Sequence, residues 1–183
     1  MKSLARCFWA VGVSVSAVAC SPGSDALLRD GNAAMRSLEK PTVDTALVEK
    51  GITSLAAFAE RYPKDPRADS ALFMLGSLHE VLGRNQRATD TFLMLVNTYP
   101  QSKFRANSII LAGHIFEEMG YYEKAKASLE RLIREYPGHE FVVNGSAQAL
   151  IDHMGQPLEE WLIPFEGDSA GSADSSKAGK ASV

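Results

Sequence analysis

The sequence predicts an all-α protein built from stacked helix-turn-helix units, and three observations support this fold class. The pair Tyr-Pro recurs at Tyr62-Pro63, Tyr99-Pro100 and Tyr136-Pro137, so the step is 37 residues. Apolar residues between these pairs follow the i, i+3, i+4, i+7 spacing of an amphipathic helix. No stretch of the sequence alternates apolar and polar residues in the manner of a β-strand. A period of about 20 to 50 residues is typical of a solenoid, in which each unit packs on its neighbours.

The N-terminal segment has the charge and hydropathy of an export signal. Lys2 and Arg6 form a short basic region, and residues 8–19 carry no charge and are mostly apolar. About a dozen apolar residues are too few to cross a hydrocarbon core of roughly 30 Å, so we do not expect a membrane helix here. We therefore expect a signal peptide over residues 1–19.

The motif Ala17-Val18-Ala19-Cys20 resembles a lipobox, the site at which bacteria attach a diacylglyceryl group to cysteine. The resemblance implies that Cys20 is lipidated and begins a short polar tether over residues 20–24. The residue after the cysteine is Ser21 and not aspartate, which by resemblance to lipoprotein sorting implies the periplasmic face of the outer membrane. Ala17-Val18-Ala19 also fits an ordinary cleavage site, so secretion without a lipid is the alternative.

Cysteine usage and charge limit what the mature chain can bind. Cys7 leaves with the signal and Cys20 is alkylated, so we expect neither a disulfide nor a free thiol. Loss of Lys2 and Arg6 from the 19 basic residues leaves 17 against 22 acidic residues, a net charge of about −5. Such a chain is not suited to nucleic acid, which needs a basic stripe to neutralise phosphates. Membrane affinity is therefore expected to come from acyl chains on Cys20.

Each period of the sequence predicts two helices joined by a tight turn. In the second period an apolar stripe runs over residues 71–82, is interrupted at Gly83-Arg84-Asn85, and resumes over residues 88–96. Tyr99-Pro100 ends the second helix, because proline cannot continue the hydrogen-bond ladder. The third period repeats this order, with its turn at Gly120.

Small and large residues in the two complete periods recur at matching positions. The second unit supplies Leu72, Leu75, Gly76, His79, Ala88, Phe92 and Pro100, and the third supplies Ile109, Ala112, Gly113, Phe116, Ala125, Leu129 and Pro137. This pattern resembles the tetratricopeptide repeat, W-x2-L-G-x2-Y followed by A-x3-F and P. The resemblance implies a right-handed α-solenoid of about 3.5 units over residues 25–165. Since the usual period is about 34 residues, we expect the additional residues in the loop after each Tyr-Pro.

The first unit and the C-terminal region depart from the complete repeats. In the first unit Glu39 replaces the glycine and Pro41 shortens the first helix, whereas other positions fit the pattern: Met35, Leu38, Gly51, Leu55, Phe58 and Pro63. Residues 140–154 are expected to form one capping helix. Leu158 to Phe165, with Trp161, is expected to fold back over the last apolar face. Residues 166–183 have no large apolar residue before Val183, which predicts a disordered tail.

The sequence shows no catalytic or cofactor signature. It contains no phosphate-binding glycine loop, no C-x-x-C pair, no H-E-x-x-H motif and no nucleophile elbow. His114 with Glu117 and Glu118 could place three metal ligands on one helical face, but a metal site needs partners from other helices too. A surface histidine on an amphipathic helix is the simpler interpretation. We therefore predict neither an enzyme nor a cofactor nor a metal site.

The resemblance implies a binding groove lined by the first helix of each repeat. The carboxylate clamp that some repeats of this family use needs Lys, Asn and Arg on successive first helices, and the apolar Phe73 and Ile110 argue against it. An extended or helical partner segment fits an apolar-centred groove better. The predicted partner-binding positions are Arg36, Lys40, Ser70, Phe73, Ser77, Glu80, Asn107, Ile110, His114 and Glu117.

The repeats and the lipid anchor together predict a scaffold in the bacterial cell envelope. The chain resembles the BamD-type lipoprotein of β-barrel assembly and the repeat domain of the Tol-Pal coordinator, and pilus or motility lipoproteins share such repeats. These resemblances imply that the partners are other envelope proteins. Two alternatives stay open at this point. One is a periplasmic protein that binds a small ligand such as a peptidoglycan fragment, and the other is a spacer that tethers a partner through its C-terminal tail.

Overall fold

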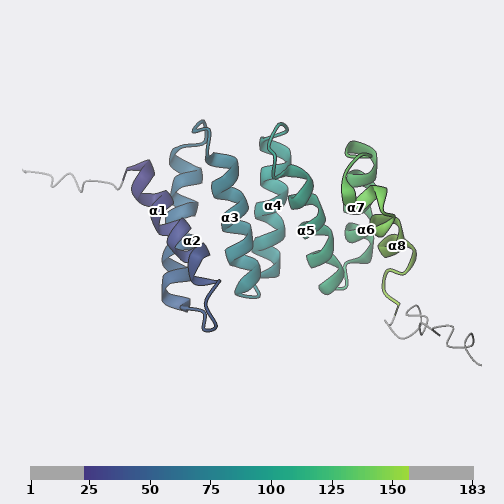
Figure 1. Cartoon of the computed structure of the whole chain (residues 1–183), viewed down its shortest axis with the longest axis horizontal. Helices are drawn as coiled ribbons and strands as arrows, with labels where there is room; N and C mark the ends of the chain where they lie inside the picture. Colours follow the sequence, from purple (N-terminus) through teal and green to yellow (C-terminus); the bar gives the residue numbers. More distant parts are fainter. Residues whose placement is uncertain (1–22, 157–183) are drawn as a thin grey trace, which may run out of the picture. The chain divides into compact units, whose positions relative to one another are not determined.

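The computed structural model describes residues 23–156, and every element within this range is a helix (Figure 1). The predicted all-α class is therefore confirmed for this part of the chain. The predicted signal peptide, Cys20, Trp161 and the predicted tail lie outside the described residues. The helices are α1 (Ser24–Ser37), α2 (Thr45–Arg61), α3 (Ala68–Val81), α4 (Asn85–Thr98), α5 (Arg105–Glu118), α6 (Tyr122–Glu135), α7 (Glu140–Val143) and α8 (Ser146–Asp152).

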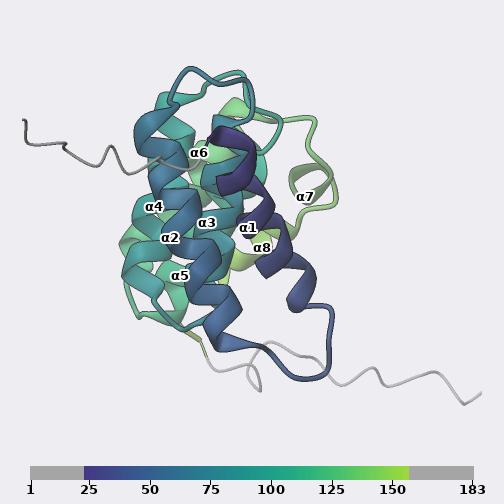
Figure 2. The ribbon, with the colours of Figure 1, turned by 90° about the vertical axis from the view of Figure 1, so that its left-hand side faces the viewer.

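The chain divides into two compact units that meet in sequence at Gly83 and Arg84. Unit 1 contains α1 to α3, and unit 2 contains α4 to α8. Within unit 1, α1 lies along α2, and both helices contact α3 (Figures 1 and 2). Within unit 2, α5 packs between α4 and α6, while α8 packs on α6 and on α7.

The backbones of α1 and α2 approach each other closely at two glycines. A Cβ on Gly51 would lie 2.3 Å from Ala34 Cβ, and a Cβ on Gly31 would lie 2.4 Å from Leu55 Cδ2. Ala34 and Leu55 have no exposed surface, so neither can move aside easily. Glycine at positions 31 and 51 is therefore what allows this helix pair to form.

The set of buried residues that the repeat pattern predicts for the first helix is wrong. The buried stripe of α1 is Leu27, Leu28, Gly31 and Ala34, whereas Met35 and Leu38 are only half-buried. The close approach at Gly31 and Ala34 sets this register, because larger side chains would not fit there. The helix ends at Ser37, before Pro41, since the residue that precedes a proline disfavours helical geometry. Asp44 then caps α2 by accepting a hydrogen bond of 3.1 Å from Leu47 N.

The turns and loops follow the predicted plan. Gly83 and Gly120 have φ values of 65° and 74°, the left-handed geometry that favours glycine at a helix end. The turn at Gly120 is closed by Tyr121 N, which donates to Phe116 O at 2.8 Å. The connections that begin with Tyr-Pro span residues 62–67 and 99–104, whereas the turns at Gly83 and Gly120 span only residues 82–84 and 119–121. The longer connections are thus the ones that follow Tyr-Pro, as expected.

Each loop after Tyr-Pro is closed in the same way. The third residue after the tyrosine uses its side chain to accept a hydrogen bond from the backbone N–H two residues later. This arrangement satisfies a donor at the start of the next helix. The three pairs are Asp65 with Arg67 N at 2.9 Å, Ser102 with Phe104 N at 3.1 Å, and His139 with Phe141 N at 3.2 Å.

The C-terminal cap is two short helices and not the single helix predicted over residues 140–154. Asn144-Gly145 separates α7 from α8, and Gly145 has a φ of 81°, which a continuous helix cannot contain. Asn144 Oδ1 accepts a hydrogen bond of 3.0 Å from Ser146 N and so stabilises the break. Ala147 of α8 nevertheless reaches a core cluster of unit 2 that contains Val96, Ala106, Ile109 and Leu132.

Candidate partner-binding surface

The predicted partner-binding residues of unit 2 lie along one side of α5. Asn107, Ile110, His114 and Glu117 are spaced i, i+3, i+7 and i+10, which places them on one face of the helix. Asn107 and His114 are exposed, and Ile110 and Glu117 are half-buried. The side chain that Gly113 lacks would instead point toward Ser128 of α6. The α5 positions are therefore available for contact to different degrees.

Two of these α5 residues already interact within unit 2. Ile110 packs against the core cluster of Val96, Ala106, Ile109, Leu132 and Ala147, so part of its surface stabilises the fold. His114 Nδ1 lies 3.6 Å from Glu118 Oε1, one helical turn away, and both side chains are about half exposed at 56% and 52%. A partner at this site would meet a polar pair at His114 and a partly covered apolar side chain at Ile110.

The predicted residues of unit 1 fall on two elements. Ser70, Phe73, Ser77 and Glu80 form a half-buried line along α3, with the same spacing as the α5 residues. The Ser77 hydroxyl donates to Phe73 O at 3.1 Å, so it is used within the helix. The α3 line presents one aromatic side chain between small and acidic ones.

Arg36 and Lys40 are both exposed, but only Arg36 lies on a helix. Arg36 occupies the last turn of α1, and Lys40 follows the helix in the connection that contains Pro41. The structure thus places Arg36, but not Lys40, on the first helix. The early end of α1 before Pro41 is the reason.

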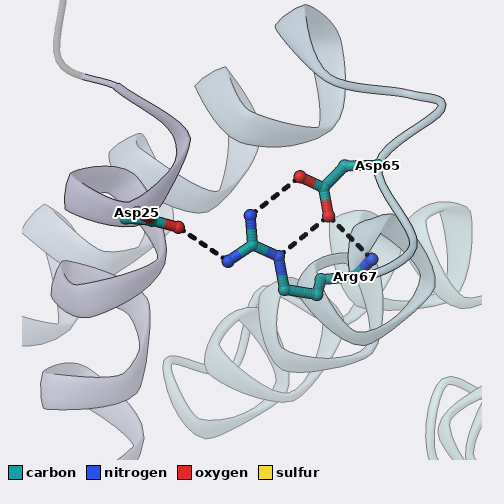
Figure 3. Close-up of polar contacts among 3 residues, drawn as sticks. All are labelled: Asp25, Asp65 and Arg67. Atoms are coloured by element: carbon teal, nitrogen blue, oxygen red, sulfur yellow. Dashed lines mark hydrogen bonds and ion pairs between the residues drawn. The ribbon is translucent and has the colours of Figure 1, made fainter.

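Sequence reasoning missed an arginine that joins the beginnings of α1 and α3 (Figure 3). Arg67 precedes α3 and holds both oxygens of Asp65, with its Nε and one terminal nitrogen each 2.8 Å from the carboxylate. Its other terminal nitrogen lies 2.7 Å from Asp25 Oδ1, in the first turn of α1. The guanidinium also lies 5.8 Å from the centre of the Phe58 ring, within cation–π range.

The hydrogen bonds from Arg67 change the titration of Asp65. The side-chain bond from Arg67, followed by the bond from its backbone N–H, lowers the pKa of Asp65 from the ordinary 3.8 to about 2. A similar pairing occurs between α1 and α2, where the hydrogen bond from Lys50 lowers the pKa of Asp30 against a smaller opposing effect of burial. Ser54 donates to the same carboxylate at 3.1 Å. Asp25 and Asp30, the two carboxylates of α1, are therefore paired with Arg67 and Lys50.

Unit 2 is joined by a less exposed network around Arg105. This side chain is 12% exposed and lies 2.6 Å from Glu135 Oε2 through one terminal nitrogen. It also donates to Tyr136 Oη and to Val96 O, both at 2.9 Å. Arg131 donates to the other oxygen of Glu135 at 2.9 Å. Burial would raise the pKa of Glu135, but the hydrogen bonds from Arg131 and Arg105 outweigh it and lower this pKa.

An exposed aromatic pair at the turn between α5 and α6 was also missed. Tyr121 and Tyr122 are 47% and 45% exposed. Lys124 Nζ lies 4.8 Å from the centre of the Tyr121 ring, and the centroids of the Tyr121 and Phe116 rings are 6.5 Å apart. Two adjacent aromatic residues at the start of an amphipathic helix were the available sequence signal, because this position is otherwise polar.

Residues 23–156 contain neither a cluster of metal ligands nor a helix that could span a membrane. No group of three or more His, Cys, Asp or Glu side chains in this range is arranged to hold a metal ion. His114, Glu117 and Glu118 thus do not form such a group. None of the helices in the same range has the length and apolar character needed to cross a membrane.

Comparisons with protein-family models agree with the repeat architecture of residues 70–139. No curated protein matches the chain. The crystal structure of MamA is similar over 71% of this chain and 71% of that chain, with 22% identity and a TM-score of 0.49, a likeness that carries no functional conclusion. Two tetratricopeptide-repeat family models match, one over residues 70–102 and one over residues 106–139. These two segments of the chain are therefore tetratricopeptide repeats.

Proposed function

We propose that this protein is a membrane-anchored scaffold of the bacterial cell envelope that binds segments of other envelope proteins. The two tetratricopeptide repeats are the observation that carries the proposal, because stacked helix pairs of this kind typically present binding surfaces for proteins. The membrane anchor rests on the sequence motif that ends in Cys20. Two or more acyl chains give stable membrane binding, whereas one gives only marginal binding.

The α3 and α5 lines support a shared mode of recognition. Ser70 and Asn107, Phe73 and Ile110, Ser77 and His114, and Glu80 and Glu117 are each separated by the repeat step of 37 residues. Both repeats thus offer a polar, an apolar, a polar and an acidic position in the same order along the first helix. A partner segment that carries an apolar side chain flanked by a basic one would match this order in each repeat.

Purification from native membranes tests both parts of the proposal. The wild-type chain is compared with Cys20→Ala, and mass spectrometry identifies the partners and the modification at the N-terminus. We expect a lipidated Cys20 and co-purifying envelope proteins, and we expect Cys20→Ala to leave the membrane fraction. A soluble, unmodified chain without protein partners would contradict the proposal and favour a periplasmic protein that binds a small ligand.

A matched pair of charge reversals tests the binding surface itself. Glu117→Lys changes the acidic position of the α5 line, and Glu130→Lys makes the same change at an exposed position of α6. Loss of the partner with Glu117→Lys but not with Glu130→Lys is expected. Equal recovery of the partner with both variants would place the binding surface elsewhere.

A further inference from the structure

The last helix of unit 2 is only partly covered by the described residues. Ala147 is the residue of α8 that is fully buried, and it faces the core cluster. Leu150, Ile151 and the following Met154 are half-buried, and their spacing places them on one side of α8 and its extension. Apolar side chains at the end of a repeat stack normally need a cap that separates them from water.

The chain leaves α8 beside an exposed tyrosine. A Cβ on Gly155 would lie 3.2 Å from two carbons of the Tyr122 ring, so the backbone at this glycine rests against the ring. Gly155 has a φ of 77°, which turns the chain after α8. Tyr122 remains 45% exposed despite this contact. Tyr122, Leu150, Ile151 and Met154 are called the C-terminal surface below.

The residues that follow Gln156 in the sequence are rich in large apolar side chains. Leu158, Trp161, Leu162, Ile163 and Phe165 fall within nine residues of Gln156, and the chain beyond them is small and polar. The five residue-to-residue steps from Gln156 to Trp161 can span about 17 Å at 3.3–3.6 Å per step. Helix α8 has seven residues and is only about 10 Å long at 1.5 Å per residue. The segment is therefore long enough to return along the whole of α8.

We propose that residues 161–165 of the same chain dock on the C-terminal surface, with Trp161 as the anchor. Trp161 and Phe165 are large aromatic side chains, and burial of such side chains dominates the energetics of apolar contacts. A second copy of the chain could offer the same segment, but a short connection gives the segment of the same chain an effective concentration in the millimolar range. The proposal does not depend on the lipid anchor or on the partner-binding surface.

The fluorescence of Trp161 provides a direct test in the full mature chain. The sequence has two tryptophans, and Trp9→Phe leaves Trp161 as the single emitter even where the leader is retained. We expect the emission of Trp161 to be blue-shifted and its quenching by acrylamide to be reduced, relative to a peptide of residues 156–166. Tyr122→Asp and, separately, Ile151→Asp should shift both readings toward those of the peptide. Met94→Asp is the control, because Met94 is an exposed apolar residue of α4, 46% exposed.

Three results would overturn the proposal. The first is a Trp161 that is quenched as readily in the wild-type chain as in the peptide. The second is a protected Trp161 that neither surface variant affects, while far-UV circular dichroism shows that both variants keep their helices. The third is protection that appears only as the protein concentration rises and the sedimenting mass doubles, since a second copy would then occupy the surface.

Discussion

The first helix pair of unit 1 and the α5–α6 pair of unit 2 are both built with glycine, but the glycines have different roles. A Cβ on Gly51 would lie 2.3 Å from Ala34 Cβ, which is an impossible separation for two carbon atoms. A Cβ on Gly113 would lie 3.4 Å from Ser128 Cβ and 3.6 Å from Leu129 Cδ2, which are close to ordinary contacts. Gly113 occupies the glycine position of the repeat pattern, whereas Gly51 occupies the position where the complete units have Ala88 and Ala125. The glycine at the consensus glycine position is therefore not the one that packing requires most strictly.

The ion pairs of the two units also differ, because those of unit 1 are more exposed to water than those of unit 2. In unit 1, Arg67 is 45% exposed and its partner Asp25 is 82% exposed. In unit 2, Arg105 is 12% exposed and Glu135 is 28% exposed. Exposed ion pairs contribute little because water and salt screen them, whereas the loss of one partner from a shielded pair leaves a poorly solvated charge. Unit 1 therefore depends more on close helix packing, and unit 2 more on its polar network.

The largest effect is expected from Gly51→Ala. The new methyl group collides with Ala34, whose Cβ is fixed to the backbone, so the helices must separate. Overpacking of this kind typically lowers the free energy of unfolding by about 1–3 kcal/mol, more than the roughly 1 kcal/mol that alanine contributes through helix propensity. Hydrogen exchange followed by mass spectrometry should show faster exchange in the peptides of α1 and α2.

Gly113→Ala is the matched control for this substitution. Its methyl group meets Ser128 at an ordinary distance, so the free energy of unfolding should change by less than about 1 kcal/mol in either direction. Similar losses for both variants would show that the close approach of α1 and α2 does not distinguish the two pairs.

A smaller loss is expected from Arg105→Met. The substitution keeps most of the apolar stem but removes the donors to Glu135, Tyr136 and Val96 O. Because Arg131 still donates to Glu135 in this variant, the free energy of unfolding should fall by only about 0.5–1.5 kcal/mol in urea denaturation. Arg67→Met should have a smaller effect that 1 M salt reduces further. A larger loss for Arg67→Met would reverse the comparison between the units.

The smallest effect is expected from Asp65→Asn, and it should be visible only in acid. The pKa of Asp65 is lowered from 3.8 to about 2 in the folded chain, so its pairing stabilises the fold above pH 4. This contribution is lost as the pH falls through about 2. Thermal unfolding between pH 7 and pH 2 should therefore depend less steeply on pH below 4 in the variant. Asp30 and Glu135, whose pKa values are also lowered, should preserve part of the slope.

An unchanged slope in Asp65→Asn would mean that Arg67 does not hold this carboxylate in solution. The substitution removes the negative charge but leaves the backbone loop intact, since the asparagine oxygen can still accept from Arg67 N. The variant thus separates the ion pair from the loop-closing hydrogen bond.

The sequence by itself determined the repeat plan, because local chemistry acts over a few residues. Tyr-Pro ends the second helices, Gly83 and Gly120 adopt the left-handed geometry of the turns, and the apolar stripes set the helical faces. The break at Asn144-Gly145 was also readable, since this dipeptide is a strong turn signal.

Only the tertiary structure decided the register of α1 and the polar contacts between helices. The consensus placed Met35 and Leu38 on the buried face of the first helix, but the space between α1 and α2 admits only Gly31 and Ala34 at the crossing. Arg67 and Arg105 find partners 42 and 31 residues away, and no local pattern encodes such distances. Helix formation follows from neighbouring residues, whereas the fit between helices depends on atoms that are brought together only when the chain is folded.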